Sequence, residues 1–550
     1  MTTRLSEAPA RPVPPVTGTR PSTTTGTGTL LRFALRRDRV RLPVWIAAGT
    51  FLVALQSVSS QSLYDTAEAL AAYRASVGSN AATIALAGPP VGLGTVAGAV
   101  AFEISATVML VAALMATSTV TRHTRADEEA GRTELVRSAR VGRHAPLLAA
   151  VLLSSLACAV LTVAVWTAAT ATGLPAVGSL FLGASFGACG LVFTGITAVA
   201  VQVTGHTRAV HGLVGGLFAV SFVLRALGDV EGSWVVWTSP IGWAQATHPF
   251  SDDAVAPLVL CAVVAVALVL AGFALLDRRD LGAGLVQPRP GPAHAPWSLR
   301  SPLGLAVRLQ RGAFVAWTLG LALLGVVQGA LAESVETLVA GNEQALAVFG
   351  DPDVGELVDA YLGTTFGVTA LLAGAYAVSS VLRARGEESG QRAEPVLATA
   401  TSRSRWLGSH VAVALAGSGL ALTASGLTTG VVRVAQTGEA AALGRMVGAA
   451  VAYVPAVWVV AGTAVALFGL LPRAATALAW TAVGVSLVLT LFAGSFDWPG
   501  WVGGLSPFGW VPLMPLEPWN AAPVLVLTGV AAVLLVAGST GFARRDLATG

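Results

Sequence analysis

Long apolar runs separated by short polar segments make up most of the chain. Beyond residue 28, each run is long enough to cross the ~30 Å hydrocarbon core of a bilayer as a helix of about 20 residues. Twelve such runs lie at about 42–60, 97–120, 145–171, 180–203, 209–227, 256–276, 312–331, 361–382, 408–432, 446–470, 474–493 and 522–542. Because lipid offers the backbone no hydrogen-bonding partner, these runs are expected to be helical. The pattern predicts an all-α polytopic membrane protein with twelve transmembrane helices.

Two segments of different composition divide this pattern. Residues 1–28 are rich in Pro, Thr and Gly and hold no apolar run, which predicts a disordered tail and no signal peptide. A Pro-rich segment at 287–298 separates two groups of six runs. We therefore expect a tail (1–28), a first six-span half (29–286), a linker (287–298) and a second six-span half (299–550).

The two halves repeat each other at spaced residues. Four residues of the first half recur at an offset of 272: Arg36, Arg39, Trp45 and Gln56 correspond to Arg308, Arg311, Trp317 and Gln328. The segment EEAGRTE at 128–134 recurs as EESGQRAE at 387–394, SPIGW at 239–243 as SPFGW at 506–510, and RRDL closes both halves. Since each half would begin and end on the same side, the sequence predicts a parallel repeat about an axis along the membrane normal.

The arginines predict the orientation. All 33 basic residues are arginine, and placing both termini inside assigns 29 of them to the cytoplasmic side. This distribution satisfies the positive-inside rule, so we expect cytoplasmic N- and C-termini in a multi-pass protein of the cell membrane. Arginines spread over membrane-flanking loops are topology signals, and no nucleic-acid partner is expected.

The absence of lysine excludes several activities from this chain. A P-loop needs a lysine on the nucleotide phosphates, so the chain is not expected to be an ordinary P-loop ATPase or to bind a nucleotide cofactor itself. The three cysteines are isolated in apolar runs, with no metal-ligand spacing. We expect no catalytic residues and no metal.

A basic amphipathic segment precedes the first span of each half. In the first half, Arg32, Arg36 and Arg39 share one face of a helix, and Arg308 and Arg311 do so in the second. Such a helix would lie in the membrane interface. A plain basic flank that only sets topology is the alternative.

The loops 122–144 and 383–405 carry charges of both signs at helical spacing. This pattern is typical of a solvated surface helix. Because the Glu-Glu-x-Gly core recurs, a docking surface for a cytoplasmic partner is the favoured interpretation.

These loops, with the amphipathic helices before them, resemble the permease subunits of ABC-2 type exporters. The doubled twelve-span form, with SP-x-GW and RRDL in both halves, resembles bacterial antibiotic exporter permeases of the tetronasin-transport type. The resemblance implies a permease without ATPase motifs, served by two copies of a separate ATPase that binds ATP and Mg. It places coupling to these ATPases on Glu128, Glu129, Gly131, Glu134 and Arg143, and on Glu387, Glu388, Gly390, Glu394 and Arg403.

Four further residues are candidates for a substrate path or gate. Glu103 and Arg225 are ionisable residues at membrane depth, where such groups usually face a bundle interior or water. Trp243 and Trp510 lie in the SPIGW and SPFGW segments, where tryptophan could anchor the chain at the interface. The resemblance implies that these segments are re-entrant and cap the outer mouth of the path.

The leading hypothesis is therefore the membrane subunit of an ATP-driven exporter that moves a hydrophobic compound through a largely apolar path. A proton-coupled secondary multidrug transporter is the alternative, and it would need Glu103 as its proton carrier. An intramembrane enzyme is disfavoured because no cluster of His, Asp and Glu at catalytic spacing appears.

Overall fold

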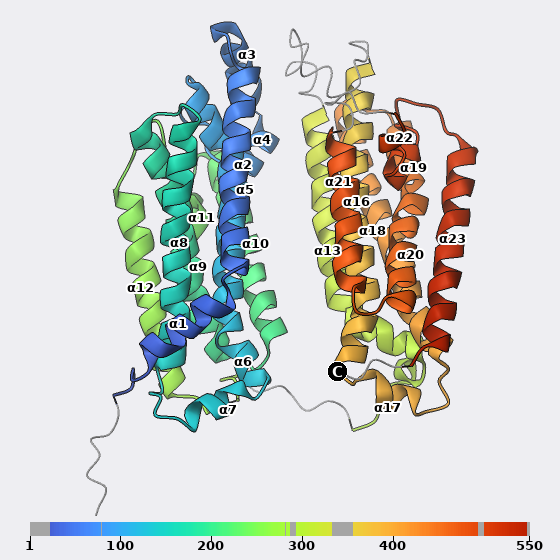
Figure 1. Cartoon of the computed structure of the whole chain (residues 1–550). Coiled ribbons are helices and arrows are strands. Elements are labelled where there is room, and N and C mark those ends of the chain that lie inside the picture. The colour runs from blue at the N-terminus through green and yellow to red at the C-terminus, as the bar shows by residue number, and fades with distance from the viewer. Residues whose placement is uncertain are drawn as a thin grey trace, which may run out of the picture. The chain divides into compact units, whose positions relative to one another are not determined.

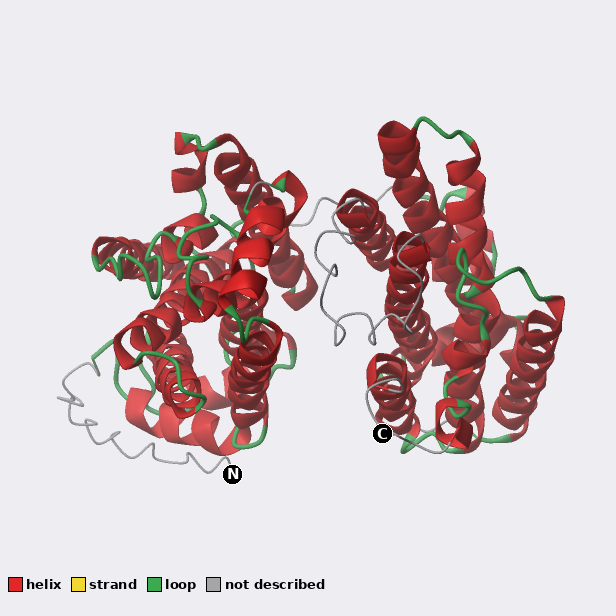
Figure 2. Ribbon diagram, turned by 90° about the horizontal axis from the view of Figure 1, so that it is seen from above, coloured by secondary structure: helices red, strands yellow, loops and turns green. Residues whose placement is uncertain are grey.

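The computed structural model describes residues 22–546 except 79, 281, 287–292, 333–355 and 493–499. Most of the predicted tail and half of the predicted linker lie outside the described residues. The chain falls into two compact units: unit 1 is Met1–Gln61 with Ile84–Arg289, and unit 2 is Ser62–Thr83 with Pro290–Gly550. The described residues contain only helices and connecting loops (Figure 2).

Unit 1 is a bundle of long helices that run side by side (Figure 1). Its long helices are α2 (Arg41–Leu63), α5 (Val96–Arg122), α8 (Ala145–Ala171), α9 (Ala176–Val203), α10 (Thr207–Glu231) and α12 (Ala256–Asp277). Its shorter helices are α1 (Thr27–Arg37), α4 (Ala81–Ala87, which begins in unit 2), α6 (Arg125–Glu129), α7 (Arg132–Arg137), η1 (Trp234–Thr238) and α11 (Pro240–Gln245).

Unit 2 contains a second bundle of long helices. These are α13 (Pro302–Ala332), α16 (Leu357–Ser389), α18 (Arg403–Thr437), α19 (Ala441–Ala452), α20 (Val454–Leu470), α21 (Ala475–Phe492) and α23 (Ala521–Arg544). The shorter helices are α3 (Ala67–Val77), η2 (Trp297–Arg300), α17 (Ala393–Leu397), α22 (Gly500–Gly503) and η4 (Pro507–Trp510).

Eleven helical segments among the described residues are long and apolar enough to cross a membrane. They match the predicted spans except 474–493, which corresponds to α21. The apolar part of α21, Ala475–Thr490, is shorter than the others. Twelve spans therefore remain a prediction. The predicted span 446–470 consists of α19 and α20, and the chain breaks at Tyr453 because Pro455 has no N–H to donate to the carbonyl of Val451.

In each unit, the second and the fourth of the long helical segments form the core. In an apolar 18-residue stretch of each segment, 72% of the residues are buried in α5–α6 and 67% in α9, whereas 17% are buried in α10 and in α12. In unit 2, the corresponding share is 72% in α16 and in α19–α20, whereas it is 17% in α23. Close approach depends on small residues: a Cβ on Gly469 of α20 would overlap the carbonyl oxygen of Gly538 of α23.

The amphipathic segments before the two first spans differ. In unit 1, α1 is a separate helix that packs on α8, and Arg32, Arg36 and Arg39 are exposed. In unit 2, Arg308 and Arg311 are also exposed, but they lie in the first turns of α13, which runs unbroken to Ala332. The predicted separate helix is therefore wrong for the second half.

A single proline accounts for this difference. Pro43, near the start of α2, cannot donate to the carbonyl of Arg39, so the helix stops at Arg37 and begins again at Arg41. The residue at the same offset of 272 is Val315, which continues the helix.

Candidate functional site

The loop 122–144 is built from two short helices joined by a glycine. Residue Gly131 has φ 69°, a left-handed conformation that favours glycine, and it turns the chain from α6 into α7. In the loop 383–405, Gly390 has φ −88°, and it is Gln391 that has a positive φ of 57°. The two predicted glycines therefore occupy different backbone conformations.

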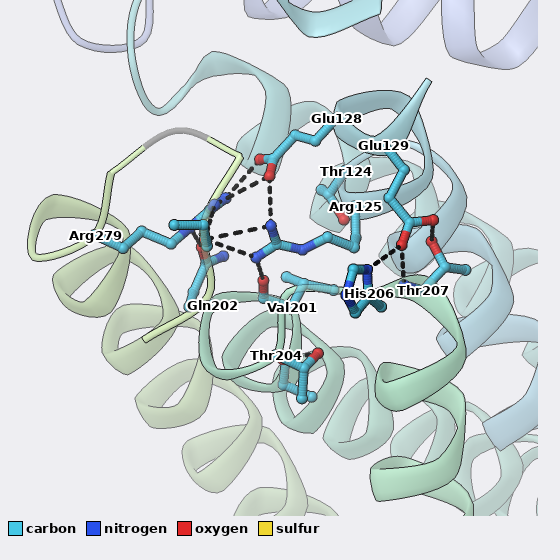
Figure 3. Close-up of polar contacts among 12 residues, drawn as sticks. Thr124, Arg125, Glu128, Glu129, Val201, Gln202, Thr204, His206, Thr207 and Arg279 are labelled. Carbon is cyan, nitrogen blue, oxygen red and sulfur yellow. Dashed lines mark hydrogen bonds and ion pairs between the residues drawn. The ribbon is translucent and has the colours of Figure 1, made fainter. Parts of the chain in front are cut away.

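Glu128 of α6 binds an arginine at the end of the last span of unit 1. Arg279 donates to Oε1 of Glu128 at 2.5 Å and to Oε2 at 3.0 Å, and both side chains are nearly buried. Arg125, one helical turn before Glu128, donates to the same carboxylate at 2.8 Å. Such a bidentate, charge-assisted pair fixes the position of the loop against α12 (Figure 3).

The same arginines also hold the end of α9. Arg125 is buried and donates to the carbonyl oxygen of Val201, and Arg279 donates through Nε to Oε1 of Gln202 at 2.6 Å. Arg143 donates to the carbonyl oxygens of Leu276 and Arg279 at 2.7 and 2.9 Å. The loop is thereby attached to two spans of its bundle by buried polar contacts (Figure 3).

Unit 2 contains an equivalent contact between an arginine and a loop carboxylate. We call this contact, Arg279 with Glu128 in unit 1 and Arg545 with Glu388 in unit 2, the clamp. Arg545 donates to the two carboxylate oxygens of Glu388 at 2.7 and 2.8 Å, and Arg385 lies 3.6 Å from the same carboxylate. Arg403 donates to the carbonyl oxygen of Arg545, as Arg143 does to that of Arg279. In both units the second arginine of the RRDL segment is the partner of the loop carboxylate.

These contacts correct the correspondence between the two acidic pairs. Direct alignment of the two Glu-Glu segments pairs Glu128 with Glu387, but Glu128 lies three residues after Arg125, as Glu388 lies three after Arg385. The preceding acids also match: Asp127 binds an arginine five residues later at 2.8 Å, and so does Glu387 at 2.9 Å. Helical register, counted from the arginine, therefore decides which carboxylates are equivalent.

Burial corrects part of the predicted docking surface. Glu387 and Glu388 are buried and Glu128 is nearly so, so these carboxylates hold the loop internally and are not available to a partner. Glu134 of α7 and Glu394 of α17 are exposed. Glu129 and Arg143 are also partly exposed, but both side chains make hydrogen bonds within unit 1.

Glu129 contacts a different helix from Glu128. Its carboxylate accepts hydrogen bonds from the backbone N–H of Thr207 at 2.8 Å and from the Thr207 hydroxyl at 2.7 Å. The Nδ1 atom of His206 lies 3.3 Å away. The first residue of α10 is thus attached to the last residue of α6 (Figure 3).

Glu103 lies on α5, and its side chain contacts α2. Its Oε2 atom accepts hydrogen bonds from Nε2 of Gln56 at 2.6 Å and from the hydroxyl of Ser60 at 2.8 Å. At the corresponding place in unit 2, Gln328 donates to the hydroxyl of Thr369 at 2.7 Å. The repeated glutamine thus joins the first two spans in each unit, and only the first unit uses a carboxylate.

Arg225 has a structural role. The side chain is fully buried and donates to the carbonyl oxygens of Ile84 and Leu86 at 3.1 Å each, while Asp229 lies 3.5 Å away. These carbonyls belong to the last turn of α4, and that of Ile84 also accepts a hydrogen bond from the backbone N–H of Gly88 at 3.0 Å. The guanidinium is therefore used to fix α4 against α10.

Trp243 and Trp510 make matching contacts. The indole N–H of Trp243 donates to the carbonyl oxygen of Trp237 at 2.5 Å, and that of Trp510 donates to Gly504 at 2.9 Å. In both cases the acceptor lies six residues earlier. Each tryptophan closes the turn that carries its SP-x-GW segment.

A buried carboxylate that sequence reasoning missed joins α1, α2 and α5. Asp38 accepts a hydrogen bond from Nε2 of His123 at 2.8 Å, and Nε of Arg122 lies 3.0 Å away. Burial alone would raise the pKa of Asp38, but the hydrogen bond from His123 and the positive charges of His123, Arg122 and Arg41 hold the pKa below its usual range.

The corresponding site in unit 2 is uncharged at this position. Gln310, at the offset of 272, lies 3.1 Å from Nδ1 of His410 and accepts from the hydroxyl of Ser380. The sequence signal for this site is the position of Asp38 between Arg36 and Arg39, two residues that recur as Arg308 and Arg311.

Comparison with known proteins gives two matches. The family described as the C-terminal domain of the multidrug efflux system permease Rv1217c matches this chain twice, over residues 28–276 and 299–543. The multidrug efflux system permease protein Rv1217c of Mycobacterium tuberculosis is 36% identical over 528 residues, which cover 95% of each chain.

Proposed function

Because this chain belongs to the family of the multidrug efflux system permease Rv1217c, we propose that it is the membrane subunit of an ATP-driven exporter. The proposed cargo is a hydrophobic compound such as an antibiotic, a drug or a lipid-like molecule. Two copies of a separate ATPase would bind ATP and Mg and would dock on the loops 122–144 and 383–405. The proposed location is the bacterial cell membrane, with both termini and both loops in the cytoplasm.

The observation that carries this proposal is the clamp on each loop. Arg279 and Arg545 lie at the ends of the last long helices of the two units, and each binds a buried loop carboxylate through two hydrogen bonds. A force applied to a loop tip would be transmitted through these contacts to a span. This is what a permease needs if its energy comes from another subunit.

A twofold organisation supports two docking sites. One family description matches both halves of the chain, at 28–276 and 299–543. The clamp, the bond from Arg143 or Arg403 and the indole bond of the SP-x-GW segment occur once in each unit. We therefore propose a duplicated permease with twelve spans, in which each half serves one ATPase.

The composition of the chain agrees with an external energy source. The chain has no lysine, so a P-loop would have to be on a partner. Proton coupling through Glu103 is the rival mechanism, and the similarity to a multidrug efflux system permease does not favour it.

An apolar pocket in unit 2 fits a hydrophobic cargo. It has a volume of about 590 Å³ and is lined by side chains that include Trp458, Met514 and Trp519. Ligand pockets for drug-sized molecules have volumes of this order. This pocket is a candidate contact for the exported compound.

Purification with the partner tests the proposal. The chain is co-expressed with the ATPase encoded beside its gene and purified by a tag on the permease. We expect the ATPase to be recovered and its hydrolysis to change on assembly. Substitution of the exposed acids, Glu134→Arg with Glu394→Arg, should reduce recovery.

Glu231→Arg is the matched control, because it reverses an exposed charge at the far end of α10. Recovery of no ATPase with the unchanged chain, or equal recovery with the double variant, would contradict the proposed docking.

A further inference from the structure

The first N–H group of α10 is capped by a residue from a distant part of the chain. The first N–H groups of a helix have no acceptor within the helix, and the residue before α10, His206, makes no capping bond with its side chain. Glu129 supplies the acceptor: its two carboxylate oxygens bind the N–H and the hydroxyl of Thr207. A carboxylate at a helix N-terminus also has a favourable interaction with the helix dipole (Figure 3).

This contact makes α6 a common attachment point for three spans. Arg125 binds the end of α9, Glu128 binds Arg279 after α12, and Glu129 binds the start of α10. The three residues lie within the five residues of α6, so their side chains move together with that short helix. Displacement of α6 would therefore displace the beginning of α10.

The second loop lacks a carboxylate at the same position. Counted from Arg385, as Glu129 is counted from Arg125, the corresponding residue is Ser389. Its hydroxyl lies 3.4 Å from the carbonyl oxygen of Gly386, one turn earlier in α16. The segment before α21 also differs, because Pro472 has no N–H to offer there.

We propose that Glu129 is a positioning residue through which the first loop moves α10, and that the two loops therefore act unequally on their fifth helices. This inference rests on the proposed function, since it concerns how a force from an ATPase would reach the spans. The side chain of Glu129 is 37% exposed, so the bond to Thr207 can form and break without burying an unpaired charge.

A reporter on α10 allows a direct test in the assembled complex. The native cysteines Cys158, Cys189 and Cys261 are buried, so a fluorophore attached through Gly212→Cys would label one exposed site on α10. A Cβ at Gly212 meets no atom within 4 Å, so this substitution fits without strain. The complex with its ATPase is placed in vesicles, and reporter fluorescence, ATP hydrolysis and ethidium export are measured together.

We expect Glu129→Ala to separate export from hydrolysis. The loss of a helix cap of roughly 1 kcal/mol corresponds to about a fivefold change, and we expect ethidium moved per ATP hydrolysed to fall by about that factor. The reporter response to Mg-ATP should fall with it, while hydrolysis continues. Glu129→Gln keeps an oxygen that can accept from the N–H of Thr207, so it should restore much of both signals and serves as the folded variant if Glu129→Ala is unstable.

Ser389→Ala is the matched change in the second loop, and we expect it to behave like the unchanged protein. If Glu129→Ala and Ser389→Ala have equal effects on export per ATP and on the reporter, the inference is overturned while the proposed function stands. If the unchanged chain recovers no ATPase or shows no ATP-dependent export, the proposed function fails, and the inference fails with it.

Discussion

Arg545 donates hydrogen bonds of 2.7 and 2.8 Å to both carboxylate oxygens of Glu388, 157 residues earlier in the chain. The carboxylate is 2% exposed and the guanidinium 15% exposed, so water screens the pair only weakly. The guanidinium also lies 5.0 Å from the ring centres of Phe468 and Phe542. The contact closes the loop 383–405 against the end of α23.

Removal of this arginine should destabilise unit 2. Arg545→Gln removes the ion pair with Glu388, and breaking a buried pair costs about 3 kcal/mol or more. We expect a lower Tm in detergent. Arg545→Lys should recover only part of the loss, because an ammonium group does not present two parallel donors.

The neighbouring arginine provides the control for this prediction. Arg544 is exposed, and we expect Arg544→Gln to leave Tm almost unchanged. In unit 1, Arg279→Gln and Arg278→Gln form the same pair of variants. Equal effects of the two arginines in either RRDL segment would show that the clamp does not stabilise the fold.

The low pKa of Asp38 predicts a stability change in acid. Because the folded pKa lies below the ordinary value, the contribution of Asp38 is fully present above the unfolded pKa of about 4 and is lost as the pH falls through the folded pKa. Asp38→Asn should lower stability by roughly 2 kcal/mol at pH 5, the value of a hydrogen bond to a charged group.

Thermal unfolding of both proteins between about pH 5 and pH 3 measures this effect. The advantage of the unchanged protein over Asp38→Asn should shrink as the pH falls below about 4. Glu231→Gln, an exposed carboxylate, serves as the control. A constant difference across the whole range would mean that the carboxylate of Asp38 is not ionised in the folded protein.

Arg225 should be needed for stability and not for transport. Arg225→Met removes the donors to the carbonyls of Ile84 and Leu86. The carbonyl of Ile84 keeps its bond from the N–H of Gly88, so the loss of the donor to Leu86 is expected to cost about 1–3 kcal/mol. We expect a lower Tm and less folded protein, with export per folded molecule unchanged. A specific loss of export at normal stability would contradict this and would support a role of Arg225 in the substrate path.

Glu103→Gln separates ATP-driven export from proton coupling. Glutamine keeps an oxygen that can accept from Gln56 or Ser60, so the contact between α2 and α5 should be largely preserved. We expect export in vesicles to fall less than tenfold and to persist when the proton gradient is dissipated. Complete loss of export in this single variant, together with loss of proton flux, would support the secondary transporter.

The sequence by itself determined where the helices lie, because only long apolar helices can satisfy their backbone inside lipid. It also located the two charged loops and the paired tryptophans, since these residues recur at nearly constant spacing. It predicted one amphipathic helix too many, because the effect of Pro43 on the path of the chain depends on its position within the first turn of α2.

Only the tertiary structure decided which helices form the core and which carboxylates bind which arginines. All the spans are apolar, so hydropathy does not distinguish a face packed on protein from a face exposed to lipid. In the structure, 72% of the residues in an apolar 18-residue stretch of α5–α6 are buried, compared with 17% in α12. The partners of Glu128 and Glu388 lie 151 and 157 residues away. Their pairing follows from helical register and from the proximity of each loop to the end of the last long helix of its unit. A one-residue deletion in the second loop conceals this register in the linear sequence.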